Sequence, residues 1–145
     1  MNQFAKDPSN AYRKAYFDKL SDQISLIAGK VIPVYDTVPD NAKAPFIILS
    51  NTTLSPILSS TGYGYNASIV IDIVTRFISG GGKKLADDIS NQVFRKILAR
   101  GKFYEDQDWN IYTSKLVSTR YLESESDGGY VIRKLITFNN HIQQL

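Results

Sequence analysis

Three short stretches of this chain carry residue types that could do chemistry. In the first, segment 80–84 (sequence GGGKK), three glycines precede two lysines at the start of an amphipathic run. A phosphate-binding loop needs four residues between its glycines and a Ser or Thr after its lysine. Here the glycines are contiguous and a second lysine follows, so the stretch indicates a flexible elbow between two elements and no nucleotide site.

The second stretch, segment 106–110 (sequence DQDWN), resembles the opening of a calcium-binding loop. That loop needs glycine at its sixth position and glutamate at its twelfth, and those places hold Ile111 and Val117. We therefore interpret the segment as a solvated turn.

The third candidate is His141, the only histidine, on which a catalytic triad or a histidine metal site would depend. Nothing near it in the sequence would orient it, and the carboxylates Asp87 and Asp88 are more simply part of a solvated helix face.

Composition limits the class of protein. The 145 residues are 43% hydrophobic and 21% charged, which is ordinary for one globular domain. The absence of cysteine excludes disulfides and thiolate zinc sites. The net charge of +3 weakly favours a polyanionic neighbour. No apolar run approaches the roughly 20 residues that span a bilayer, and the N-terminus lacks a signal-peptide segment. These features favour an interaction module that is not an enzyme and holds no cofactor or metal.

The strongest structural signal lies in residues 63–100. Residues 65–78 alternate with period two, which predicts a long strand with one apolar face. After the glycines the period becomes helical, and apolar residues recur every four positions from Leu85 to Ile97. The strand and the helix each carry a single apolar face, so these two faces should form the core. The strand residues expected in that core are Ala67, Ile69, Ile71, Ile73, Thr75 and Phe77.

The remaining segments complete the expected fold. Apolar spacing predicts a helix from Tyr12 to Ala28, capped by Ser9 or Asn10 and ended by Gly29. Segments 31–34 (an edge piece with a proline), 46–51, 109–125 and 130–138 are predicted strands, with an exposed loop over 52–64 and a tight turn over 126–129. We expect an α+β fold: an antiparallel β-sheet with long hairpins and two helices packed on one face, in the order α-β-β-β-α-β-β. The expected boundaries are an N-terminal arm at 1–10, one domain at 11–140 and a polar C-terminal tail at 141–145.

Contact residues for a protein partner are expected at the ends of the long hairpins. Aromatic residues beside glycines in an exposed loop are typical of protein interfaces, and cations there could pair with acidic neighbours. For each such cation, an ordinary solvated side chain is an equally good interpretation. The candidates are Ser55, Pro56, Tyr63, Tyr65, Arg76, Lys83, Lys84, Arg120, Glu123, Glu125, Asp127 and Tyr130.

The order of these segments resembles the phage tail-completion family, also called tail terminators or minor tail proteins. The resemblance covers about residues 11–140, by the same order-of-elements criterion. It is carried by the segments AYFDKLSDQI, GKVIPVYDTVP, APFIILSNTTLS, YNASIVIDIVTRF, GGGKKLADDISNQVFRKIL and SKLVSTRYLESESDGGYVIRKLITF. None of these is a catalytic signature, and the arm FAKDPSN lies outside the pattern.

The resemblance implies a structural virion protein. Members of that family form closed rings that end the tail tube or join it to the head connector, and DNA passes through the ring. It implies a ring of six or twelve copies, contacts with tail-tube or portal-connector proteins, and a virion location after assembly in the host cytoplasm, with no membrane. The alternative is a small nucleic-acid-binding domain. The sequence favours the ring because its basic residues are scattered along the chain.

Overall fold

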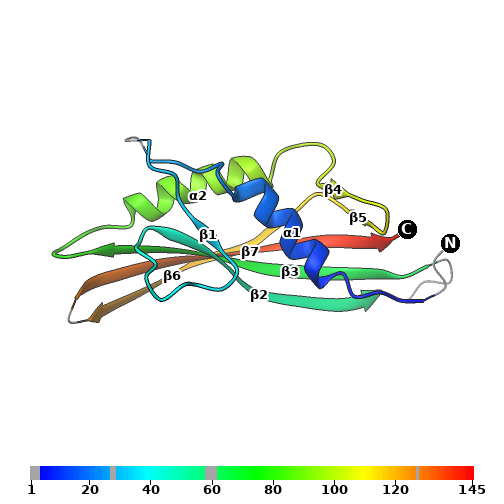
Figure 1. Ribbon diagram of the computed structural model, residues 1–145, viewed down its shortest axis with the longest axis horizontal. Coiled ribbons are helices and arrows are strands. Elements are labelled where there is room, and N and C mark those ends of the chain that lie inside the picture. Colours follow the sequence, from blue (N-terminus) through cyan, green and yellow to red (C-terminus); the bar gives the residue numbers. More distant parts are fainter. Residues whose placement is uncertain (1–3, 27–28, 58–61, 127) are drawn as a thin grey trace.

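The computed structural model describes residues 4–26, 29–57, 62–126 and 128–145, which form two helices and one seven-stranded sheet (Figure 1). The sheet order is β1-β2-β3-β7-β5-β4, and β6 pairs with β7 on the same side as β5. The elements are α1 (Ser9–Leu20), β1 (Val34–Tyr35), β2 (Phe46–Ile57), β3 (Gly64–Phe77), α2 (Lys84–Ile97), β4 (Tyr104–Glu105), β5 (Trp109–Ile111), β6 (Lys115–Ser126) and β7 (Gly129–Gln144).

The sheet is antiparallel except for the short β1–β2 pair at its edge. Both helices lie on one face of it, and the opposite face carries no helix (Figure 1). We call the second face the open face. The expected α+β class and the helices on one side are thus confirmed.

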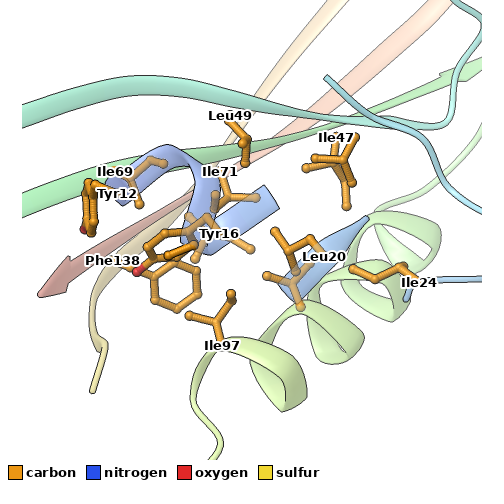
Figure 2. Close-up of a cluster of buried hydrophobic side chains, with 14 of the residues drawn as sticks. Tyr12, Tyr16, Leu20, Ile24, Ile47, Leu49, Ile69, Ile71, Ile97 and Phe138 are labelled. Carbon is orange, nitrogen blue, oxygen red and sulfur yellow. The ribbon is translucent and has the colours of Figure 1, made fainter. Parts of the chain in front are cut away.

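The core lies between the helices and the sheet (Figure 2). The alternation predicted for β3 is confirmed, since Ala67 to Thr75 are buried at every second position. Ile89, Val93 and Ile97 of α2 and Tyr12, Tyr16 and Leu20 of α1 meet this surface and are fully or almost fully buried. Burying a large apolar side chain contributes about 1.5–3 kcal/mol, so this layer supplies most of the stability.

The first helix is shorter than its apolar spacing predicts. α1 ends at Leu20, Ser21 is extended, and Asp22 has a left-handed φ of 60°. The N–H of Ile32 donates to the carbonyl of Ile24 at 2.8 Å, so the chain doubles back. Ile24 is still fully buried, because an extended segment places it in the core as well as a helix would. Residues 27 and 28, which the prediction placed in this helix, lie outside the described residues. The expected cap is also wrong: Asp7 accepts hydrogen bonds from the Ser9 N–H and hydroxyl.

Three strand boundaries differ from the expectation. β1 begins at Val34 instead of residue 31. β2 continues to Ile57 through what was predicted as a loop, with a β-bulge between Leu49 and Thr52. Pro56 is tolerated because the outer side of β2 has no strand partner there among the described residues. The strand expected at 109–125 is divided into β5 and β6, and the connector before it contains β4.

The largest correction concerns the C-terminus. The last strand was expected to end at residue 138 and a polar tail to occupy 141–145, but β7 continues to Gln144 and pairs with β3 as far as Gln143. Asn140, Ile142 and Gln144 are buried there. The expected arm is shortened too, since α1 begins at Ser9. The side chains of Asn140, Gln143 and Gln144 make internal hydrogen bonds, which composition alone does not reveal.

Candidate assembly surfaces

The predicted contact residues divide between the two ends of the long sheet. Tyr65 and Arg76 both lie on β3, and eleven residue steps separate them. At about 3.3 Å per residue, that separation is about 36 Å. Ser55, Pro56 and Tyr63 lie at the end with Tyr65, which also holds the chain termini (Figure 1). The predicted contact residues therefore form two separate surfaces, one at each end of the sheet. Asp127 lies outside the described residues.

At the end with the termini, Tyr65 is a structural residue. Its hydroxyl donates to the Lys6 carbonyl at 2.9 Å, and its ring meets the Trp109 ring edge-on at 6.2 Å between centroids. Ser55 and Pro56 are exposed on β2, and Tyr63 is 40% exposed. Ser55 and Pro56 remain available to a neighbour at this end, the Tyr63 carbonyl accepts hydrogen bonds from Gln143 and Gln144, and Tyr65 holds the chain's own N-terminal segment.

That N-terminal segment is fastened to the last strand. The Lys6 N–H donates to the Gln144 side-chain carbonyl at 2.9 Å, and the Gln144 amide donates to the Phe4 carbonyl at 2.8 Å. The Lys6 ammonium also pairs with Asp108 at 2.9 Å. Phe4 itself is 79% exposed. An aromatic side chain held in solvent by a fixed backbone is suited to a contact with another protein.

At the opposite end, the hairpin tip and the start of α2 form a charged cluster. Lys83 pairs with Glu123 at 3.2 Å. Hydrogen bonds from Lys83 and Tyr130 lower the pKa of Glu123, and the same carboxylate raises the pKa of Lys83. Arg76 donates from Nε to the Gly128 carbonyl at 3.2 Å and so holds the tip. Lys83, Glu123 and Tyr130 are thus brought together by contacts within the chain, and Arg76 lies at the same end on the open face.

Lys84, Arg120 and Glu125 have other surroundings. Lys84 forms an i,i+4 pair with Asp88 at 2.8 Å on the exposed side of α2. With both lysines of segment 80–84 paired to carboxylates, no cation there is directed at a phosphate. Glu125 and Arg120 are exposed on β6. Within the described chain, Arg120 has no hydrogen-bond or ion-pair partner, so it remains available for an external one.

Sequence reasoning missed a second cluster beneath the hairpin. Asp87 of α2 accepts from Lys134 at 2.8 Å and from the Tyr121 hydroxyl. Burial raises the pKa of Asp87, but these hydrogen bonds and the Lys134 charge outweigh that effect and leave the pKa below its usual value. Lys134 also lies over the Tyr121 ring at 5.1 Å. The cluster joins α2 to β6 and β7, and only the strand register brings its members together.

The open face holds the other feature that the sequence did not disclose. Asp72 is fully buried in β3 although no helix covers it. The Arg133 guanidinium forms a two-point ion pair with it from β7. This pair lies among partly covered apolar side chains of neighbouring strands, including Val70, Val74 and Leu135. A charged residue inside an Ile/Val strand was the available signal, but its partner could not be read without the register.

The edges of the sheet offer backbone groups for pairing. β6 contacts β7 on one side, and its other side has no strand partner among the described residues. Leu116, Val117 and Leu122 of β6 are exposed apolar residues. The outer side of β2 is paired with β1 only at Ile47 and Ile48. Such unpaired edges readily accept a strand from another chain.

Cavities and possible metal ligands are weaker features. A shallow groove of about 580 Å³ runs along α2, lined by Ser25, Leu26, Gln92 and Arg95 among others. Gln92 closes part of it by bonding both backbone groups of Ser25. The described ranges contain no group of three or more His, Asp or Glu side chains placed to hold a metal. No helix among them has the length and apolar character needed to cross a membrane.

The fold is similar to that of a solved virion protein. It matches a chain in the structure of the virion of a native gene transfer agent (GTA) particle, with a TM-score of 0.72. The match covers 96% of this chain and 99% of that chain at 16% sequence identity. At this identity the likeness establishes a shared fold. No protein-family model matches the sequence, and neither does any curated protein.

Proposed function

We propose that this chain is a structural virion protein that forms a closed ring at the head–tail junction. In this role it ends the tail tube, or links the tube to the portal connector, and lets DNA pass through its lumen. The observation that carries the proposal is the likeness to a virion chain over nearly the whole length of both chains.

The strand directions support assembly of identical copies. A closed ring needs a heterologous interface, in which one patch meets a different patch on the next copy. Apart from the short pairing of β2 with β1, the outer sides of β2 and β6 have no strand partner among the described residues, and three successive antiparallel pairings make these two strands run in opposite directions. Rotation about an axis along the strands therefore places the β2 edge of one copy antiparallel to the β6 edge of the next. Strand addition across copies is a common mode of recognition.

The two ends of the sheet suit neighbours stacked along the ring axis. One end presents Phe4 and Tyr63, and the other presents the charged cluster of Lys83 and Glu123. Because the two ends differ in chemistry, one ring could bind different proteins above and below it. This matches a position between a tail tube and a connector.

The test is the solution mass of the protein by light scattering at low and high concentration, with negative-stain images of the same samples. The expected mass is that of six or twelve copies, with ring-shaped particles. A Val117→Asp variant places a charge on the unpaired β6 edge and should shift the mass to that of one copy. The matched control is Ile78→Asp, at a 92% exposed position before α2, which should leave the ring intact. A single-copy mass at every concentration would refute a self-assembling ring.

A further inference from the structure

We propose that the open face of the sheet is a contact surface for the phosphate backbone of double-stranded DNA, through a diagonal of arginines formed by Arg76, Arg133 and Arg120. The inference rests on the proposed function, in which DNA passes through the ring. It adds which face of the chain meets the DNA and which side chains make the contact.

The strand register places the three arginines on one line. On β3, Arg76 pairs with Val131 of β7, which is two residues before Arg133. On β6, Arg120 pairs with Leu135 of β7, which is two residues after Arg133. Each arginine is therefore the diagonal neighbour of the next, across β3, β7 and β6. Diagonal neighbours in a sheet lie about 7–8 Å apart, so the line is about 15 Å long.

Near the arginines the exposed charge on this face has one sign. On β3, β7 and β6, Asp72 is the only acidic residue that the described strands place on the open face, and it is fully buried beneath Arg133. Glu105 of β4 lies on the same face at the end with the termini, where it pairs with Lys102. Arg133 remains 41% exposed, and Arg76 and Arg120 are exposed. Lys115 of β6 adds a fourth cation, opposite Asn139. The part of the face formed by β3, β7 and β6 thus offers cations and no accessible carboxylate among the described residues, and such a surface complements a polyanion.

The helix-bearing side differs in this respect. Lys83, Lys84 and Lys134 are each paired with a carboxylate on that side. Their charges are largely cancelled locally. On the open face of β3, β7 and β6, Asp72 pairs with Arg133 alone, which leaves Arg76, Arg120 and Lys115 without a carboxylate partner among the described residues.

The surroundings of the arginines indicate contact with the backbone and no reading of bases. The face is broad, and its far half carries uncharged polar residues that can donate to phosphate oxygens: Ser68, Thr137, Asn139 and Gln143. Among the described residues neither helix lies on this face, so no helix is placed to enter the major groove (Figure 1). Phosphate contacts fix position without carrying sequence information, which is what a passage for any DNA requires.

The first test is fluorescence anisotropy with a labelled 20-base-pair duplex over a series of salt concentrations. Arg120→Gln should weaken binding by roughly three- to tenfold at low salt and reduce the slope of log affinity against log salt by about 1. The matched control is Arg95→Gln, which removes the same charge from an exposed position on α2 and should change neither quantity. Equal losses in both variants would mean that only net charge matters and would overturn the proposal.

The second test is a gain of binding. Asp72→Asn keeps the shape of the side chain and releases Arg133 from its ion pair, so duplex binding should become tighter and the salt slope steeper. Asp88→Asn is the control, because it releases Lys84 on α2 with the same change in net charge. If Asp72→Asn binds no more tightly than Asp88→Asn, the open face is not the DNA contact.

Light scattering on the same samples separates this inference from the ring itself. A ring-sized wild type that fails to bind the duplex at low salt would overturn the DNA contact and leave the proposed function standing. A single-copy protein that passes both tests would support the surface and remove the ring. If Arg120→Gln disrupted the ring and left duplex binding unchanged, the arginines would belong to a protein interface and the proposal would be wrong.

Discussion

Replacing Asn140 with alanine should be one of the most damaging single changes in this chain. Asn140 of β7 is buried, and its side-chain carbonyl accepts from the hydroxyls of Tyr12 at 2.8 Å and Tyr16 at 2.5 Å. Its amide donates to the Tyr112 carbonyl and the Ser114 hydroxyl, both at 2.8 Å. Burial raises the pKa of both tyrosines above its usual value, so their hydroxyls stay protonated and donate. One side chain thus joins α1 to the break between β5 and β6.

The magnitude follows from what the substitution leaves behind. The four lost hydrogen bonds are each worth about 1 kcal/mol net. The Tyr16 hydroxyl keeps Ser114 as a partner, while the buried Tyr12 hydroxyl loses its Asn140 acceptor and keeps only the neighbouring Tyr16 hydroxyl. A buried group that loses its hydrogen bonding costs about 1–3 kcal/mol, and the Tyr12 hydroxyl incurs part of that cost. Because these terms overlap, we expect Asn140→Ala to lower the free energy of unfolding by about 3–5 kcal/mol, a large part of the typical 5–15 kcal/mol.

Urea unfolding followed by circular dichroism measures this difference, at one protein concentration because assembly shifts apparent stability. Asn139→Ala is the matched control, since the neighbouring residue lies on the open face and should cost less than about 1 kcal/mol. Tyr12→Phe in the Asn140→Ala background should recover part of the loss by removing the hydroxyl that has lost its Asn140 acceptor. The reasoning fails if Asn140→Ala and Asn139→Ala are equally stable, or if Tyr12→Phe adds its full cost to that of Asn140→Ala.

Two further predictions concern the hairpin end of the sheet. Gly129 has a φ of 137°, and an added Cβ would lie 2.3 Å from the Phe77 carbonyl oxygen. Gly129→Ala should therefore cost about 1–3 kcal/mol of folding free energy and lower the melting temperature by several degrees. Gly82→Ala is the control, because its added Cβ has no atom within 4 Å, and an equal loss there would contradict the steric argument. The folded-state pKa of Asp87 is lowered, so its stabilisation is present above the unfolded value of 3.8 and is lost as the pH falls through the folded pKa. Melting temperatures between pH 2 and 7 should therefore decline less steeply at the acid end for Asp87→Asn than for the wild type, and identical acid limbs would show that the Lys134 pair contributes nothing.

The centre of the fold was predictable because its pattern admits one interpretation. Ile69, Ile71 and Ile73 alternate with less apolar residues, and only a strand places them on one face. The α2 stripe repeats at four residues and is flanked by glycines and terminal cations. In both segments local preference and tertiary burial agree, so the sequence alone is sufficient.

The first helix and the last strand were predicted less well, for one physical reason. Hydrophobic spacing reports which residues are buried and does not fix the backbone that buries them. Ile24 is in the core as predicted, yet it arrives there through an extended segment. The polar residues of 139–144 resemble a tail because composition cannot show that Asn140 and Gln144 have partners in α1 and the N-terminal segment.

The contact surfaces depend on register more than on composition. Arg76, Arg120 and Arg133 are spread over 58 positions of the sequence, and each alone is an ordinary solvated cation. They lie on one line only because of two strand registers, that of β3 with β7 and that of β6 with β7. A shift of one residue in either pairing would move a whole strand's side chains to the other face.

Asp72 shows the same dependence, since it has a partner only while Arg133 remains its diagonal neighbour. The buried Asp72–Arg133 pair therefore penalises any slipped register by leaving a charge unpaired in an apolar setting. The carboxylate that shields one arginine of the diagonal thus also helps to keep all three arginines on the open face.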